Sequence, residues 1–523
     1  MARGALATLG LVVVGGVGGA AMGAGCSSSG SVELVIDVPA DSSLSPIDDR
    51  VARLTLVTQA DGRSTQLQNV DVASPPMRGQ ILAFGDVPID TGVMLDLQAT
   101  SPSGRLLGFG HAGPLDVTSG GAVSVSVRLR RPFVYVAGAA SLWAFDATVE
   151  PGQPYARAVA MPAQPAAVAT TPDGGEVVVV ANDALVLVST STHAIAGGSA
   201  ALEPGAVDVA VSPDGKWAAV AHVGGFSLVD LVALRVGDAT AGFAAIDGAA
   251  SVAVGDGTAY VLTNAAQPMS CAAPSQIVPV PLAPTPSPGT PIPLASGARD
   301  LAVVTRGPRA GSLIVAEPCQ NALVIANADG SGQTALLQVP NLTSVAVSDQ
   351  RVWGIGWRGS ASALNLVLAS VGFDGQAPTS LSLAPSEALA QSNDLTEPGQ
   401  VTEDRLGADA LEPYELTILP GARHAALLLH GQFHADQVIR SVAIGGTVVN
   451  QIILPRIDMQ TEEYVLIDVT AGAAAQRLRT RCAIDWEHDV AVIDDWSCAT
   501  SPGQDVAADS YTPLHHAVLY GGD

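Results

Sequence analysis

The chain repeats itself. The segment ATTPDGGEVVVVAN, which begins at Ala169, returns as AVSPDGKWAAVAHV at Ala210, about 41 residues later. In each copy a short apolar run leads into a Pro-Asp-Gly turn, and a second apolar run follows the turn. Short apolar runs on both sides of such a turn are typical of antiparallel strands. A repeat of this length indicates a chain built from similar units that pack against one another.

Further copies of the first apolar run continue almost to the C-terminus. Each clear copy is followed by a second β-like run, and most by a third. Units of about 40 to 50 residues with four short antiparallel strands are typical of β-propeller blades. Residues 133–523 resemble the YVTN-type, lactonase-like seven-bladed propellers, whose repeat has SPDG between the inner and second strands. The later copies are ASVAVGDG, RDLAVVT, TSVAVSD, YELTILPG and LHHAVLYGG.

The two ends of this region predict how a ring of blades would close. The segment from Phe133 reads as outer strands with no inner strand before it, whereas PLHHAVLY near the C-terminus reads as an inner strand with nothing after it. Their pairing would complete one blade and leave no open edge, which favours seven blades. The PDG turns then lie on one face. The loops between second and third strands lie on the other, with the blade-to-blade connections, and we call this the top face.

Residues 32–131 carry a different pattern. Apolar and polar residues alternate in short runs such as VELVIDV and AVSVSVRLR, separated by turns rich in Gly, Pro, Asp and Ser. Such runs predict an antiparallel β-sandwich of immunoglobulin-like size. His111, the one histidine of this segment, is expected at the surface. The sequence therefore predicts an all-β chain, with an N-terminal immunoglobulin-like β-sandwich followed by a seven-bladed β-propeller over residues 132–523, closed by the C-terminal strand.

The first residues read as an export signal. Arg3 precedes an apolar, Gly-rich stretch, and the small residues of GAGC lead directly to Cys26. Residues 1–25 resemble a bacterial lipoprotein signal peptide, which is cut before the cysteine that then carries lipid; an ordinary secretory signal and an uncleaved anchor are the alternatives. Residues 26–31 would form a flexible tether. By the same resemblance, Ser27 implies anchoring in the outer membrane of a Gram-negative bacterium, on its periplasmic or cell-surface side.

The charge balance limits the partners. The formal net charge is −25 and Lys216 is the one lysine, so a basic groove or membrane-binding face has few residues to be built from. We therefore expect no nucleic-acid partner. A strongly negative field attracts cations, so a divalent cation is electrostatically acceptable, although no cofactor is expected.

Alignment of the repeats places one position of each inner strand near the top of the central channel. Three carboxylates and a histidine would converge there, and hard cations take oxygen ligands. The same pattern is expected if the acidic residue simply belongs to the repeat and faces channel water. The candidate ligand-binding residues at this position are Asp208, Ser251, Asp300, Ser344, Glu415 and His515. In the first copy of the repeat, the apolar residue Ala167 occupies the same position.

Unusual segments are expected to gather on the top face, near the last two blades and the first. Residues 386–413 are acidic, show no β pattern and are expected to form a solvated loop. HGQFHAD is expected to follow the second strand of the seventh blade, and DWEHDVAVIDDWSC to precede the closing strand. A metal site and exposed turns are both open interpretations, since two histidines four residues apart on a straight strand would lie about 13 Å apart. The candidate metal ligands are His430, His434, Asp436 and His488.

Four cysteines besides Cys26 suit an oxidising compartment. None has CxxC spacing, and the sequence alone permits three pairings. The propeller that the chain resembles would place Cys271 and Cys319 in second-to-third-strand loops of neighbouring blades. This favours a disulfide between them, with Cys482 and Cys498 forming a second.

No catalytic signature such as GxSxG or HExxH occurs in a usable context. The resemblance does not decide the activity, because propellers host many unrelated functions. We expect a lipoprotein with a noncatalytic binding or scaffold role. Its lipid would contact the membrane, and the top face of its propeller would take a protein, a glycan or a small ligand. The alternative is a metal-dependent, lactonase-like hydrolase that uses the channel.

Overall fold

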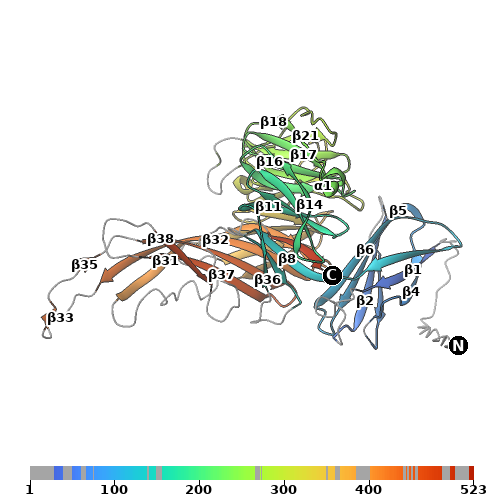
Figure 1. The fold of residues 1–523 in the computed structure, drawn as a ribbon, viewed down its shortest axis with the longest axis horizontal. Helices are drawn as coiled ribbons and strands as arrows, with labels where there is room; N and C mark the ends of the chain where they lie inside the picture. The colour runs from blue at the N-terminus through green and yellow to red at the C-terminus, as the bar shows by residue number, and fades with distance from the viewer. Residues whose placement is uncertain are drawn as a thin grey trace.

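The computed structural model of this chain is almost entirely β-structure. Figure 1 shows an N-terminal two-sheet region, a set of small sheets, and a last sheet whose long strands extend away from the others. The helices in the described ranges are too short to span a bilayer. For 156–157, 401–414, 430–439, 443–444, 447–448, 452–453, 457–463, 465, 473–485, 495–500 and 517–522, only the backbone is described. The structure describes residues 29–38, 50–60, 66–74, 76–137, 141–148, 156–265, 271, 274–348, 351–359, 365–383, 401–439, 443–444, 447–448, 452–453, 457–485, 495–500 and 517–522.

The N-terminal region has two sheets around a common apolar core. In the first sheet, β1 (Gly30–Asp37) lies between β4 (Ile81–Val87) and β7 (Ala122–Arg128), and it pairs with β7 in parallel. Alternate residues of β1 are buried, as its period-two pattern predicts. The second sheet has the order β3 (Gln66–Asp71), β2 (Arg53–Gln59), β5 (Asp90–Thr100), β6 (Leu106–Val117).

Strands β3 and β4 are absent from the sequence prediction. All residues of β3 are exposed or half-buried, so this strand carries no alternation between a buried and an exposed face. The expectation that His111 lies at the surface is corrected as well. His111 is half-buried on β6, where its Nδ1 lies 2.5 Å from a carboxylate oxygen of Asp96 on the neighbouring β5.

The repeats form small antiparallel sheets whose first strands contact one another in succession, which fits a propeller. The sheets, each written from its innermost strand outward, are β39 (Ala517–Gly522), β8 (Arg131–Ala137), β9 (Ser141–Asp146), β10 (Ala156–Ala160); β11 (Pro165–Thr170), β12 (Glu176–Ala181), β13 (Ala184–Ser189), β14 (Ala194–Ala201); and β15 (Ala206–Val211), β16 (Trp217–His222), β17 (Gly225–Asp230), β18 (Ala241–Ala245). Then follow β19 (Ala249–Val254), β20 (Thr258–Thr263), β21 (Gln276–Pro281), β22 (Ile292–Pro293); β23 (Asp300–Val303), β24 (Leu313–Glu317), β25 (Ala322–Ala326), β26 (Thr334–Gln338); and β27 (Ser344–Val347), β28 (Arg351–Arg358), β29 (Asn365–Gly372), β30 (Thr379–Leu383).

The PDG segments form the turns between first and second strands, as the repeat predicts. In the first of them, the N–H of Gly174 donates to the carbonyl oxygen of Thr171 at 2.8 Å. Gly174 and Gly215, the glycines of the two clear copies, have φ values of 74° and 68°. A side chain is disfavoured at positive φ, so the turn requires glycine there.

The C-terminal strand completes the first sheet. β39 pairs antiparallel with β8, so that Ala517 lies opposite Val136 and Gly522 opposite Arg131. This confirms the predicted pairing of the two ends of the repeat region. The first strand of the last sheet and β11 both contact β39, so the succession of inner strands returns to its start.

Apolar layers between neighbouring sheets hold the ring together. Alternate residues of β8 face opposite sides: Phe133 and Tyr135 pack with β11–β13, whereas Val134 and Val136 pack with the last sheet. On that side the rings of Phe145 and Tyr464 stack, with their centroids 4.7 Å apart. Because both faces of each sheet are covered, second strands such as β12 are apolar along their length rather than alternating.

The last sheet corrects two sequence expectations. Its strands are β31 (Val401–Ile418), β32 (His424–Ile439), β36 (Ile457–Asp468), β37 (Ala473–Asp485) and β38 (Asp495–Thr500), with β35 (Ile452–Ile453) beside β32. The acidic segment 386–413, expected as a loop, is a strand from Val401 onward. HGQFHAD, expected after the second strand, lies within β32. The two strands are 18 and 16 residues long and pair with each other through the segments that carry these charged residues. This pairing overrides the weak local β pattern.

The N-terminal region contacts the ring through the turn between β31 and β32. Arg423 in this turn donates to the carbonyl oxygen of Ser103, and its Nη2 lies 2.9 Å from a carboxylate oxygen of Asp468. The next residue, His424, is 4% exposed. Burial lowers the pKa of His424 to about 4, and the positive charges of Arg423 and Arg105 act in the same direction, against Asp468.

We expect acid to destabilise this contact through His424. An unfolded histidine takes up a proton near its ordinary pKa of 6.5, whereas the folded one does so only near pH 4. Between these pH values the unfolded state binds more protons, so the free energy of unfolding falls as pH decreases, by at most about 3 kcal/mol. Denaturant unfolding from pH 7.5 to 4.5 should show a shallower loss in His424→Gln than in the wild type. Equal slopes would contradict this assignment.

Candidate functional site

The predicted channel residues occupy equivalent places. In register, Asp208 pairs with Ala221, Ser251 with Leu262, Asp300 with Ala316, Ser344 with Ile355 and Glu415 with Leu428. In every pair the second residue belongs to the second strand of the sheet. These residues are therefore equivalent in the strand register, as the repeat alignment expects. That they bind a ligand stays a prediction, and His515 lies outside the described residues.

Asp300 connects three sheets. Its Oδ2 accepts hydrogen bonds from the Ser344 hydroxyl at 2.7 Å and from the Val345 N–H at 2.9 Å. Its Oδ1 accepts from the Leu301 N–H at 2.7 Å and from the Ser251 hydroxyl at 3.3 Å. Burial raises the pKa of Asp300 above its ordinary value, although each of these bonds favours the ionised form. The carboxylate thus joins β23 to β19 on one side and to β27 on the other.

Asp208 makes a corresponding connection two sheets earlier, from β15 to β19. Its Oδ1 accepts from the N–H of Val209 at 2.8 Å, and its Oδ2 accepts from the N–H of Val252 on β19 at 2.8 Å. The partner in the next sheet is the residue after Ser251, just as Val345 follows Ser344. Asp208 and Asp300 therefore hold neighbouring inner strands together, and this role accounts for an acidic residue at this place in the repeat.

The candidate metal ligands of the last sheet do not form a described site. β32 runs without a break through His430, His434 and Asp436, and only their backbone is described. A continuous strand keeps the two histidines at the wide spacing that opposes a shared ion. His488 lies outside the described residues. Where side chains are described, no group of three or more His, Cys, Asp or Glu residues is arranged to hold a metal ion.

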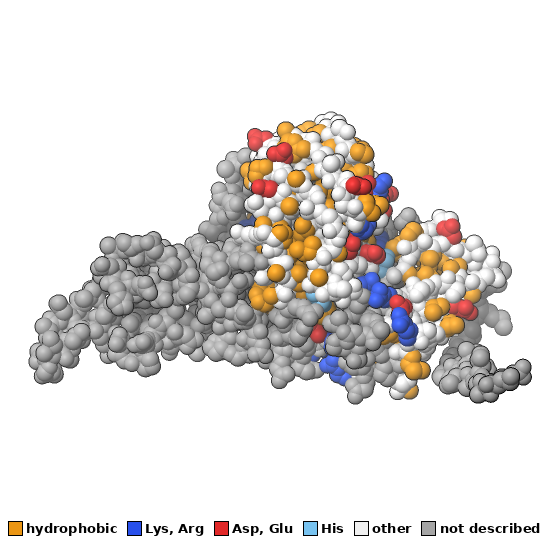
Figure 2. All heavy atoms as spheres, viewed as in Figure 1, with side chains coloured by type: hydrophobic (Ala, Val, Ile, Leu, Met, Phe, Trp, Pro, Cys, Tyr) orange, Lys and Arg blue, Asp and Glu red, His pale blue; other side chains and the backbone are white. Residues whose placement is uncertain are grey.

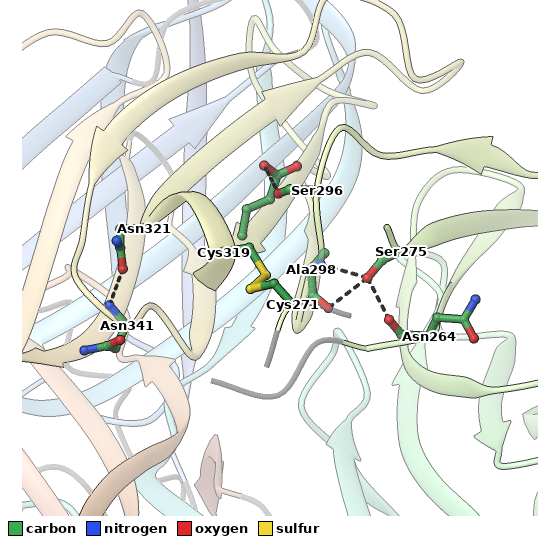
Figure 3. Close-up of a disulfide and its surroundings, with 9 residues drawn as sticks. Asn264, Cys271, Ser275, Ser296, Ala298, Cys319, Asn321 and Asn341 are labelled. Carbon is green, nitrogen blue, oxygen red and sulfur yellow. Dashed lines mark hydrogen bonds between the residues drawn. A yellow bond between two sulfur atoms is a disulfide. The ribbon is translucent and has the colours of Figure 1, made fainter. Parts of the chain in front are cut away.

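The predicted disulfide between Cys271 and Cys319 is present, with Cα atoms 5.8 Å apart (Figure 3). It joins the loop between β20 and β21 to the 3-10 turn between β24 and β25, both second-to-third-strand connections. Beside it the N–H of Ala298 donates to the Ser275 hydroxyl at 2.8 Å (Figure 3). The top face of these neighbouring sheets is therefore held by covalent and polar contacts.

A buried carboxylate lies next to this disulfide. Glu317 is 1% exposed, and its Oε2 accepts a hydrogen bond from the Ser296 hydroxyl at 2.8 Å. Burial raises the pKa of Glu317. We assign it a structural role, because the bond joins the segment before β23 to the end of β24.

A cleft of about 920 Å³ lies between the second sheet of the N-terminal region and the face of the ring that carries the PDG turns. Residues of β2, β3, β5, β6 and β7 line one side, and the first-to-second-strand turns of several sheets line the other. The cleft is thus on the face opposite to the top face.

Charged side chains gather in this cleft. Asp96 contacts His111 within the N-terminal region, and its other oxygen lies 3.6 Å from Nη1 of Arg306 in the ring. Across the same boundary, Nη1 of Arg130 donates to the Thr190 hydroxyl at 3.4 Å. Figure 2 shows Lys and Arg side chains along this junction. The charged and titratable residues of the lining are Asp96, His111, Arg128, Arg130, Asp173, Arg306 and Arg351.

No sequence signal identifies this cleft, because its members are scattered from β2 to the turn after β31. Asp96 is on β5, whereas Arg306 follows β23, so the strands β8–β22 of the ring lie between them in the sequence. The two residues approach each other only in the folded chain.

Comparisons with known proteins give no family. No protein-family model and no curated protein matches the chain. Many solved structures have a similar fold. A functionally unknown protein from Desulfotomaculum acetoxidans DSM 771 is 13% identical, with a TM-score of 0.40, over 61% of this chain and 95% of that one. The Myceliophteria thermophila Cps50 (Swd1) β-propeller domain is 11% identical, with a TM-score of 0.34, over 61% and 97%.

A third solved structure is the dihydro-heme d1 dehydrogenase NirN in complex with DHE. It is 12% identical, with a TM-score of 0.37, over 66% of this chain and 72% of that one. At these identities and scores, none of the three structures assigns a function to this chain.

The connecting role of Asp300 predicts a large loss of stability in Asp300→Ala. The substitution leaves the N–H groups of Val345 and Leu301 without their acceptor, at a cost of about 2 kcal/mol or more. Thermal and denaturant unfolding should show this loss, whereas Asp247→Ala, at an exposed position, should stay within about 0.5 kcal/mol of the wild type. Equal stability of the two variants would contradict the assignment.

The second disulfide stays a prediction that the strand register supports. Cys482 on β37 lies directly opposite Cys498 on β38 in an antiparallel pair, a position from which two cysteines can form a disulfide. We expect peptide mass spectrometry of the unreduced mature protein to recover Cys271 joined to Cys319 and Cys482 joined to Cys498. Free thiols at Cys482 and Cys498, detected by alkylation before reduction, would contradict the second pair.

Proposed function

We propose that this chain is an exported lipoprotein with a noncatalytic binding or scaffold role. The lipid would be attached to Cys26 and hold the protein at the outer membrane of a Gram-negative bacterium. This part of the proposal rests on the sequence of residues 1–31, of which the structure describes only the end. The tether would let the folded regions stand away from the bilayer.

One observation carries the noncatalytic part of the proposal. The carboxylates of Asp208 and Asp300 accept hydrogen bonds from N–H and hydroxyl groups of neighbouring inner strands. A carboxylate used in this way has few lone pairs left for a metal ion. The channel residues therefore support a rigid ring better than they support a metal-dependent hydrolase.

The top face is the surface that we propose for a protein, glycan or small ligand. Val223, in the loop between β16 and β17, is 61% exposed, and Phe243 on β18 is 45% exposed. In this proposal the two side chains would offer apolar contact to a partner. The Cys271–Cys319 disulfide holds loops of the same face and would keep that surface preorganised.

The finer architecture belongs to the same proposal. We propose that the sheets of the ring are the seven blades of a YVTN-type propeller covering residues 132–523. The first blade would be the sheet of β39 and β8–β10, and the last the sheet that contains β31 and β32. The N-terminal two-sheet region, residues 32–131, would be an immunoglobulin-like sandwich, preceded by the signal peptide of residues 1–25 and the tether of residues 26–31. Successive contacts of the inner strands support the blade count.

Metal analysis tests the noncatalytic role against the hydrolase. We expect the mature protein, purified without chelator, to contain no stoichiometric metal by plasma mass spectrometry. Asp300→Asn should lower the unfolding temperature and leave the metal content unchanged. A stoichiometric metal that is lost in Asp300→Asn or in His515→Ala would contradict the proposal and favour the hydrolase.

Substitution of Cys26 tests the anchor. Cys26→Ser should abolish labelling by radioactive palmitate and move the protein from the membrane fraction to the soluble periplasmic fraction, because serine cannot receive the lipid. Ser28→Ala, two residues further on, should leave both properties unchanged. Palmitate labelling that persists in Cys26→Ser would contradict the lipoprotein assignment.

A further inference from the structure

The cleft between the N-terminal region and the PDG face of the ring is lined by more basic than acidic residues, although the protein as a whole is acidic. The whole chain has a formal net charge of −25. Four arginines and a histidine line the cleft, against two carboxylates; one of the arginines, Arg128, also has its Nε 3.8 Å from a carboxylate oxygen of Asp37 outside the lining. A cleft that encloses an excess of cations attracts anions, because its walls exclude water and concentrate the field.

Neutral acceptors hold the side chain of Arg351 in place. Its Nε donates to the Ser370 hydroxyl at 2.9 Å, and its Nη2 donates to the carbonyl oxygens of Ser370 and Ala377 at 3.1 and 2.5 Å. All three acceptors are neutral, so they fix the guanidinium in place without cancelling its charge. A fixed and planar guanidinium is suited to carboxylate or phosphate oxygens.

Arg306 and His111 share one carboxylate partner, Asp96. Arg306 is 26% exposed, and its carboxylate partner Asp96 lies at 3.6 Å, longer than a normal charge-assisted hydrogen bond. The same carboxylate contacts Nδ1 of His111 at 2.5 Å. Since a carboxylate only accepts, Nδ1 carries the proton in this contact, and Nε2 is the ring atom left for a ligand. One carboxylate therefore serves two basic groups.

The second carboxylate of the lining, Asp173, also has partners of its own. Asp173 lies in a PDG turn, where Gly175 N–H donates to its Oδ1 at 3.0 Å. Burial alone would raise the pKa of Asp173, but this hydrogen bond, the Thr171 hydroxyl, and the charges of Arg130 and Arg235 lower it. Asp173 is thus ionised near neutral pH and opposes an anion in the cleft.

The size and the remaining lining indicate what kind of anion fits. A volume of about 920 Å³ is within the usual range for sites that take small molecules. Apolar side chains also line the cleft: Leu67 is 57% exposed and Phe109 is half-buried. Such side chains would cover an apolar part of the ligand while the arginines hold its charged end.

We propose that this cleft binds a small organic anion, with its carboxylate or phosphate oxygens held by Arg306 and Arg351 and its apolar part against the N-terminal sheet. The ligand would contact both the N-terminal region and the ring and would stabilise their junction. This site is on the face opposite to the one proposed for partners, so the two proposals can fail separately.

Titration calorimetry on the full mature chain at low ionic strength tests the site, with inorganic phosphate, phenyl phosphate and citrate as probes. Low salt is needed because screening weakens partly exposed charges. We expect the wild type to bind at least one probe, and phenyl phosphate more tightly than inorganic phosphate. Stronger binding of citrate than of both phosphates would identify carboxylate as the group preferred.

Matched variants separate the site from general charge effects. Arg306→Gln and Arg351→Gln should each weaken binding by about tenfold or more, as expected for loss of a charged hydrogen-bond donor. Arg358→Gln is the control, because Arg358 ends the strand that Arg351 begins and is exposed. Asp173→Asn keeps an acceptor for Gly175 but removes a negative charge, so binding should become several-fold tighter.

Three results would overturn the proposal. The first is that no probe binds the wild type. The second is that Arg358→Gln weakens binding as much as Arg351→Gln does, which would indicate only an overall charge effect. The third is that Asp173→Asn weakens binding while thermal unfolding shows an intact fold, since a site for anions cannot lose affinity when a nearby negative charge is removed. Thermal unfolding of every variant identifies any that fail to fold, and Asp173→Asn remains informative because its turn is retained.

Discussion

The pairing of β39 with β8 is the contact on which the ring depends. Without β39, the first sheet would expose the free edge of β8 to the channel, and β11 and β31 would lose the strand that lies between them. The apolar layers on both sides of β8, one containing Phe133 and the other Val134, are covered only when the ring is complete. Closure by the chain end therefore links the stability of every sheet to a segment of six residues.

Closure also decides what the polar residues of the inner strands do. Inner strands of neighbouring sheets approach closely, so their backbone N–H groups need acceptors on the channel side. Asp208 and Asp300 supply these acceptors and connect successive strands. Two of the residues that the repeat alignment selects as possible ligands, Asp208 and Asp300, thus connect the inner strands of the ring itself. This structural use of the two carboxylates is the observation on which the proposed noncatalytic role rests.

The sequence was informative where structure is local and repeated. The PDG turns, the inner strands that precede them, and the loops that hold Cys271 and Cys319 follow from short patterns. The polar strand β3 has no such pattern, and the part of β31 before Tyr414 was missed because its acidic residues oppose a local strand prediction. The cleft could not be predicted, because Asp96 and Arg306 are distant in the sequence and approach each other only where the N-terminal region meets the ring.

Hydrogen exchange in a truncated chain tests ring closure most directly. The measurement compares amide exchange in β8 (Arg131–Ala137) between the full mature chain and a chain that ends before Ala517. If β39 closes the ring, β8 should lose its protection in the truncated chain, and β11 and its sheet should become less protected as well. Unchanged protection of β8, with an unchanged unfolding temperature, would contradict closure by the C-terminal strand.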